Sequence, residues 1–91
     1  MITAEQTRAG RAWLDWTQQE LATKAEVGLS TLRAFEAGQR APIRANLSAI
    51  QRTLEAGGIR LVFNDDGKAT GIAVDDARTG QVSEASAEGA F

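Results

Sequence analysis

Residues 17–38 have the sequence TQQELATKAEVGLSTLRAFEAG, and the rest of the chain is organised around them. Thr17 and Glu20 have the spacing of a capping box, in which a threonine hydroxyl and a glutamate side chain satisfy free amides at the start of a helix. The apolar residues after the box predict a helix to about Ala25, followed by a tight turn. A second short helix then ends before Gly38, because glycine is the usual left-handed residue after a helix.

The second helix of this stretch, about residues 29–37, is amphipathic. Leu32 and Phe35 share one side of it and are expected to anchor it to the other helices. The other side has small or hydrogen-bonding side chains and one arginine, namely Ser30, Thr31, Arg33 and Ala34. A short helix with such a surface is suited to a groove about 12 Å wide, which is the width of the DNA major groove.

A helix is predicted at residues 3–16, before this stretch. Thr3 and Gln6 have capping-box spacing, and apolar residues recur after them at helical intervals. We expect these to face the core: Ile2, Ala9, Ala12, Trp13 and Trp16, with Leu14 beside them. The tryptophans are expected to pack in the core or in a dimer, with stacking on nucleic-acid bases as the alternative.

A fourth helix is predicted after the loop that contains Pro42, the only proline. It begins between Ile43 and Asn46 and ends at Ala56, because two glycines follow. Its apolar stripe has the i, i+3, i+7 spacing of a helix that packs on one side, and consists of Leu47, Ile50 and Leu54.

A β-hairpin is predicted next, with strands at residues 59–63 and 70–74 and a turn at 64–67. An isolated two-stranded hairpin is only marginally stable in water. It must therefore pack on the helices, pair with a second subunit, or do both. We predict a dimer contact through the apolar residues of the first strand, Ile59, Leu61, Val62 and Phe63.

The predicted fold class is mainly α: a four-helix bundle that contains a helix-turn-helix, followed by a C-terminal β-hairpin. We expect residues 1–57 to form the helix-turn-helix domain and residues 58–75 the hairpin and dimerisation element. Residues 76–91 contain few apolar side chains, and we expect a flexible tail there.

The composition favours a small globular protein: 91 residues, 43% of them hydrophobic and 24% charged. No apolar run approaches the roughly 20 residues that span a bilayer, and the N-terminus lacks the apolar core of a signal peptide, so we expect a cytoplasmic protein. The net charge is −2, but the acidic excess lies after Gly57. The helical part can therefore still carry a local basic patch.

Catalysis and metal binding are not expected. The chain has no His and no Cys, which removes the commonest metal ligands and acid–base groups, and nothing indicates a Ser–Lys dyad. The clustered acids Asp65, Asp66, Asp75 and Asp76 lie in predicted turns, where such residues are common. We therefore predict no enzyme activity and no cofactor.

The run TQQELATKAEVGLSTLRAFEAGQRAP resembles the Cro/repressor (XRE-like) helix-turn-helix family of bacterial and phage regulators. The resemblance covers about Thr7 to Leu54 and implies a lambda-repressor-like helix-turn-helix bundle. Family members usually have Ser, Thr or another capping residue where this chain has Gly28. The segment TLEAGGIRLVF also resembles short family members that end in a strand.

The resemblance implies that the second helix of the motif reads DNA bases in the major groove. The matching positions are Leu29, Ser30, Arg33 and Ala34, and the hydroxyl of Thr31 can also donate to bases or phosphates. Arg33 is suited to guanine, with a phosphate contact or a surface ion pair as the alternative. For Leu29 the alternative is capping or packing of the helix start.

The resemblance also implies phosphate contacts and one structural ion pair. The phosphate positions are Gln18, Arg40 and Arg44, with Thr17 beside them at the helix N-terminus, where free amides favour anions. An ordinary solvated surface role is the alternative for Gln18, Arg40 and Arg44. Arg11 and Glu36 match a pair that links the first and third helices.

The predicted function is a homodimeric transcriptional regulator that binds an inverted repeat in double-stranded DNA. The alternative is an antitoxin-type or antiactivator-type module, which binds a protein partner through the acidic hairpin or tail and uses DNA binding for autoregulation.

Overall fold

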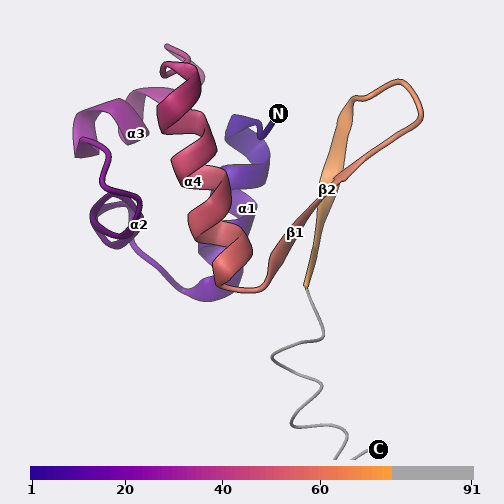
Figure 1. Ribbon diagram of the computed structural model, residues 1–91, viewed down its shortest axis with the longest axis horizontal. Coiled ribbons are helices and arrows are strands. Elements are labelled where there is room, and N and C mark those ends of the chain that lie inside the picture. Colours follow the sequence, from indigo (N-terminus) through magenta and orange to yellow (C-terminus); the bar gives the residue numbers. More distant parts are fainter. Residues whose placement is uncertain (75–91) are drawn as a thin grey trace, which may run out of the picture.

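The computed structural model describes residues 1–74 of the chain. Four helices precede a two-stranded antiparallel sheet: α1 (Ala4–Leu14), α2 (Gln18–Ala25), α3 (Leu29–Glu36), α4 (Arg44–Ala56), β1 (Ile59–Phe63) and β2 (Ala69–Val74). The helices form a bundle, and the hairpin leans away from it (Figure 1). The predicted helical bundle with a C-terminal hairpin is confirmed. The flexible tail predicted for residues 76–91 lies outside the described residues.

Local capping decides where α1 and α2 begin. The Thr3 hydroxyl accepts from the Gln6 amide at 3.1 Å, and the Gln6 side chain accepts from the Thr3 amide at 3.1 Å. Thr17 and Glu20 make the same reciprocal pair at 3.0 and 2.7 Å. Each pair satisfies two amides that lack a partner within the helix. Both predicted capping boxes are therefore confirmed.

Left-handed residues end the helices. Asp15 has φ 59° and stops α1 after Leu14, so the helix is shorter than the predicted residues 3–16. Gly38 has φ 77° after α3, in agreement with its predicted role. Its amide donates to the carbonyl of Phe35 at 3.0 Å, which satisfies one of the last helical carbonyls.

The core lies between the four helices and the start of β1. Its buried apolar residues come from every helix except α1, together with residues that flank the helices: Ile2, Leu21, Ala22, Ala25, Leu32, Phe35, Ile50, Leu54 and Ile59. Within residues 1–74, none of the helices combines the length and apolar character needed to cross a membrane.

The face of α1 that is buried in the core differs from the predicted face. Ala9 and Ala12 are exposed, and Trp13 is 61% exposed, whereas Ile2 is buried and Trp16 is partly buried. The residues of α1 that face inward are Gln6, Thr7 and Gly10. The prediction for Ala9, Ala12 and Trp13 was wrong because apolar periodicity does not detect a helix face built from polar side chains and glycine.

This buried face of α1 is tolerated because its polar groups have partners. The Thr7 hydroxyl donates to the Thr3 carbonyl at 2.8 Å, so this buried hydroxyl has the partner that a buried polar group needs. Gly10 has no side chain, and a Cβ placed there would lie 3.3 Å from Leu54 Cδ2 and 3.4 Å from Ile59 Cγ2. Glycine thus allows α4 and the start of β1 to approach α1 closely.

The hairpin packs on the helices of its own chain. β1 contacts α4, and β2 contacts α1. Ile59, paired with Val74, is 2% exposed and belongs to the helical core. At the other end, Asn64 Oδ1 accepts from the amides of Asp66 and Lys68 at 2.9 Å, which closes the predicted turn.

Candidate nucleic-acid interface

The turn between α2 and α3 takes its shape from Glu26. This residue has φ 60° and caps the C-terminus of α2, while the partly buried Val27 packs against the core. Gly28, with φ −66° and ψ 142°, is the N-cap of α3, and no side chain caps that helix. Because any residue can adopt these angles, the turn does not require glycine at position 28.

Helix α3 has two distinct faces. Leu32 is completely buried, and Phe35 and Glu36 are also buried. The five predicted base-reading residues differ in exposure: Ser30 and Arg33 are exposed, and Leu29, Thr31 and Ala34 are partly buried. Leu29 also packs against the core. The helix therefore presents mostly small and hydroxyl-bearing side chains to solvent, with one long cation.

A shallow groove joins this exposed face to the loop that follows. Ser30, Thr31 and Ala34 line it from α3, and Arg40 and Pro42 line it from the loop. Arg40 and Arg44 are both exposed. The structure thus brings three of the predicted base-reading residues together with one predicted phosphate contact.

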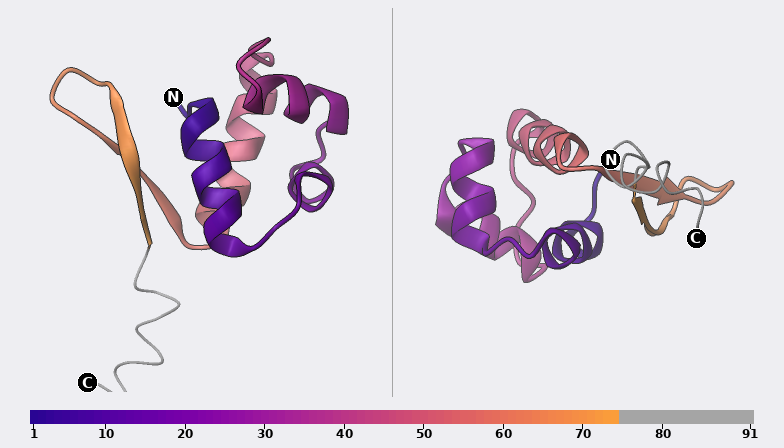
Figure 2. Two further views of the ribbon diagram at one scale, coloured as in Figure 1. Left: turned by 180° about the vertical axis from the view of Figure 1, so that it is seen from behind. Right: turned by 90° about the horizontal axis from the view of Figure 1, so that it is seen from below.

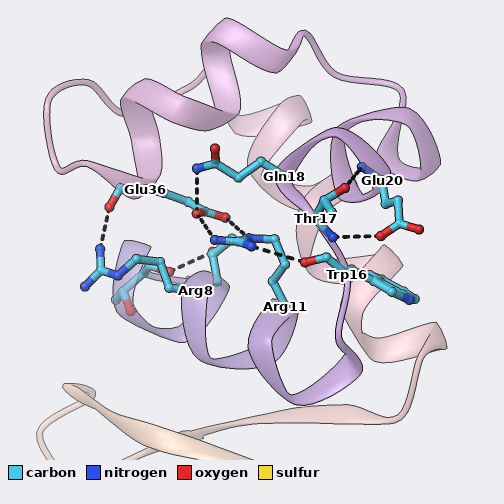
Figure 3. A network of polar contacts seen from close by, with 9 residues as sticks. Arg8, Arg11, Trp16, Thr17, Gln18, Glu20 and Glu36 are labelled. Carbon is cyan, nitrogen blue, oxygen red and sulfur yellow. Dashed lines mark hydrogen bonds and ion pairs between the residues drawn. The ribbon is translucent and has the colours of Figure 1, made fainter.

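On the buried side, Glu36 lies at the centre of a polar network (Figure 3). Its side chain is 3% exposed. Arg11 Nε donates to Glu36 Oε2 at 2.9 Å, and Arg11 Nη2 donates to Oε1 at 2.8 Å. Gln18 Nε2 donates to the same Oε1 at 3.0 Å. One carboxylate therefore joins α1, α2 and α3.

Two further contacts extend the network. Arg11 Nη1 donates to the carbonyl of Trp16 at 3.1 Å, which ties down the segment between α1 and α2. Arg8 Nη1 donates to the backbone carbonyl of Glu36. This carbonyl lies at the C-terminus of α3, where the negative end of the helix dipole favours a cation. This role of Arg8 was not predicted from the sequence, although its spacing of three residues from Arg11 on α1 was an available signal.

Arg11 is electrostatically suited to this site. Its hydrogen bonds to Glu36 raise the pKa of the guanidinium above its ordinary value, partial burial opposes this shift, and the charge of Glu36 reinforces it. Arginine is already charged at any physiological pH. The guanidinium therefore stays charged, and its two parallel hydrogen bonds to Glu36 define the geometry of the pair.

The predicted phosphate contacts of α2 lie at its N-terminus. Thr17 is exposed, and its hydroxyl accepts from the Glu20 amide. The Gln18 side chain is directed to Glu36, so one of its donors already has a partner within the protein. A phosphate contact by Gln18 must use its remaining donor or its backbone amide.

The predicted dimer residues of β1 differ in their surroundings. Ile59 is buried in the core of its own chain, and Leu61 packs partly against that core. Val62 is partly buried, and Phe63 is 37% exposed. Ile59 and Leu61 are therefore engaged with the core of their own chain, whereas Val62 and Phe63 are not among the residues packed against it.

The acidic turns do not form a metal site in the described residues. Asp65 and Asp66 are exposed, and residues 1–74 contain no cluster of three or more carboxylates able to hold an ion. Asp75 and Asp76 lie outside this part of the chain.

The sequence matches the helix-turn-helix family HTH_3 over residues 8–57, which is more than half of the chain. The chain therefore belongs to this family, whose members are DNA-binding regulators of the XRE (Cro/repressor) type. The matched residues include α2, α3 and every member of the Glu36 network. The predicted family is confirmed. A search among curated proteins returned no match for the chain.

The Glu36 network leads to a prediction about stability. Glu36→Gln should lower the free energy of unfolding by about 2–3 kcal/mol, because Arg11 loses its charged partner in a partly buried site. The loss is smaller than for a fully buried pair, because the Arg11 side chain is 22% exposed. Urea unfolding measures it. Glu55→Gln is the control, since Glu55 is exposed and should change stability by less than about 0.5 kcal/mol. Equal losses would contradict the role of Glu36.

The uncapped start of α3 leads to a second prediction. Gly28→Ser should raise the free energy of unfolding by about 0.5 kcal/mol, because the serine hydroxyl can accept from an amide in the first turn. A Cβ at this position would make only an ordinary contact, 3.6 Å from Thr31 Oγ1. Gly38→Ser is the matched control and should destabilise by about 1 kcal/mol, because φ is positive there. Thermal unfolding of both variants tests the contrast.

Proposed function

We propose that the protein is a homodimeric transcriptional regulator that binds an inverted-repeat operator with α3 in the major groove. The division of α3 into two faces is the observation that best supports this function. Glu36 and Leu32 hold one face inside the protein, and the opposite face lies beside the exposed Arg40. In helix-turn-helix proteins the second helix of the motif enters the groove with its N-terminal residues on the bases.

The side chains of α3 then have separate tasks at the bases. Arg33 forms a bidentate pair with guanine, which is worth about 1–3 kcal/mol of discrimination. Ser30 and Thr31 donate to base edges or to nearby phosphates, and Leu29 and Ala34 meet thymine methyl groups. Since Arg33 is the only long polar side chain on this face, DNA shape and half-site spacing must supply much of the remaining specificity.

Phosphate contacts on both sides of the groove fix the position of α3. Arg40 and Arg44 bind the backbone from the loop and from the start of α4. Thr17 and Gln18 bind it from the N-terminus of α2, where free backbone amides and the helix dipole favour an anion. These contacts set the register on the duplex without reading its sequence.

Dimerisation supplies the second half-site. Successive half-sites on one side of the duplex are about 34 Å apart, so one copy of α3 contacts only one of them. The hairpin is the proposed contact, because Phe63 is exposed, Val62 is only partly buried, and a two-stranded sheet has unpaired edges that can accept another strand.

A second candidate function is binding of a protein partner at the hairpin turn, as in the antitoxin-type alternative. The exposed Phe63 lies next to the exposed acids Asp65 and Asp66. An apolar side chain beside two carboxylates suits a partner with an apolar and basic surface. DNA binding would then serve autoregulation.

Two arginines should separate base reading from phosphate binding. Duplexes selected from random DNA supply the specific site, and a scrambled duplex supplies the non-specific one. Arg33→Ala should weaken specific binding by about 1–3 kcal/mol and change non-specific binding little. Arg40→Ala should weaken both and make the slope of log affinity against log salt shallower by about 0.9 for each phosphate that it no longer neutralises. Fluorescence anisotropy over a salt series measures both effects.

Arg52→Ala is the control for this experiment. Arg52 is also exposed, but it lies in α4 beside Trp16 and Lys24, away from the groove of α3. Arg52→Ala should therefore leave the difference between specific and non-specific affinity, and the salt slope, nearly unchanged. Equal losses on both duplexes for Arg33→Ala would reassign Arg33 to the backbone, and failure to select any sequence would overturn the proposed function.

Dimerisation through the hairpin is tested by sedimentation. The full chain should sediment as a dimer at about 10 µM, which requires a dissociation constant of about 1 µM or below, equivalent to about 8 kcal/mol. Phe63→Asp should shift the population to monomer, because an unpaired charge would enter the interface. Ala45→Asp adds the same charge at an exposed site on α4 and should remain dimeric. A monomeric wild type would contradict the proposal.

A further inference from the structure

The side chain of Gln6 forms a buried connection between α1 and the hairpin. It is 2% exposed. Its Oε1 accepts from the Thr3 amide at 3.1 Å, and its Nε2 donates to the carbonyls of Val62 and Gly71, both at 3.1 Å. A glutamine amide has two N–H donors, so both are used on the hairpin, one on each strand.

Gln6 contacts the hairpin where its register is irregular. Val62 pairs with Gly71, but Phe63 pairs with Ala69, so Thr70 is an extra residue in β2. Such a bulge bends and twists a strand locally. By bonding to both strands at this point, Gln6 fixes the direction in which the hairpin continues away from the bundle.

The hairpin is therefore held on the helical bundle by apolar packing and by hydrogen bonds. Ile59 lies in the core, Leu61 and Ile72 pack against it, and Gln6 supplies the hydrogen bonds to both strands. Apolar contacts alone have no preferred direction, whereas the two hydrogen bonds of Gln6 define how the hairpin is oriented on α1. The turn of the hairpin extends away from the helices, as the opposite and lower views show (Figure 2).

Helix α1 also carries the connection to the recognition helix. Arg8 and Arg11 bind Glu36 at the end of α3, while Gln6 binds the hairpin. α1 is thus joined by hydrogen bonds to both, so that the orientation of the hairpin relative to α3 depends on side chains of one helix.

We propose that Gln6 is a positioning residue that sets the half-site spacing read by the dimer, an inference that rests on the proposed function. If two subunits join through their hairpins, any rotation of the hairpin on α1 moves the two copies of α3 relative to each other. Neighbouring base pairs are about 3.4 Å apart along the duplex. A displacement of only a few ångströms therefore changes the preferred spacing by one base pair.

Gln6→Glu is the discriminating variant. Glutamate is as suitable as glutamine at this position of a capping box, so the start of α1 is preserved. Its carboxylate, however, has no donor and would face the carbonyls of Val62 and Gly71. Gln51→Glu is the matched control: it adds the same charge on α4, where the bond that the described residues show for the Gln51 side chain is to the exposed Glu55 of the same helix.

The readout is affinity for duplexes with two selected half-sites separated by spacers of different length, together with a duplex that carries one half-site. We expect wild type and Gln51→Glu to lose about tenfold in affinity or more when the optimal spacer changes by one base pair, equivalent to about 1.4 kcal/mol. For Gln6→Glu, the same change of spacer should lower the affinity by less than about threefold, or the variant should prefer a spacer of another length. Its affinity for the single half-site should be unchanged. A purely structural role would weaken all duplexes alike.

Hydrogen exchange locates the effect in the protein. In Gln6→Glu the amides of β1 and β2 should exchange about tenfold faster or more, while those of α2 and α3 remain protected. An unchanged spacer profile in Gln6→Glu would overturn the proposal. Should that variant fail to fold, Gln6→Met removes the same donors without burying a charge, and the same profile decides the question.

Failure of the proposed function gives a different result. Wild-type protein that binds the single half-site but has no spacer preference would exclude the hairpin dimer, and the role of Gln6 in spacing with it. A wild-type preference that persists in both Gln6 variants would overturn only the role of Gln6.

Discussion

The burial of the Glu36 carboxylate is the constraint on which the rest of the helical bundle depends. A carboxylate removed from water is tolerated only when charged and hydrogen-bonding partners replace the solvent. Arg11 from α1 and Gln18 from α2 supply those partners. The two helices must therefore occupy positions from which both side chains reach the end of α3. Since this interaction holds one face of α3 inward, the opposite face is left on the surface.

Helix α1 has the complementary role of connecting the parts of the molecule. Its buried residues are Gln6, Thr7 and Gly10, and its exposed side includes Trp13. This reverses the usual distribution of polar and apolar side chains. It is stable because every buried polar group named here has a partner, and because the absence of a side chain at Gly10 lets α4 and β1 pack closely. α1 consequently contributes polar connections rather than a large apolar surface.

The candidate interface could be identified from the sequence only in part. The residues of α3 were found because amphipathic spacing separates Leu32 and Phe35 from Ser30 and Arg33, and because the motif resembles a known family. The pairing of Arg11 with Glu36 came from that resemblance alone. The bonds of Arg8 and Gln18 to Glu36 were not predicted, because they join helices whose packing is not encoded in local spacing. For the same reason, the grouping of Arg40 with the α3 groove required the structure.

By itself, the sequence determined the features that depend on neighbouring residues: the capping boxes at Thr3 and Thr17, the left-handed stop at Gly38, and the turn at Asn64. Each rests on hydrogen bonds or backbone angles within a few residues. Only the tertiary structure decided which face of α1 is buried and where Gln6 directs its two donors. Those outcomes depend on carbonyls that lie 56 and 65 residues away along the chain. A polar side chain becomes a core residue only when folding brings such partners to it.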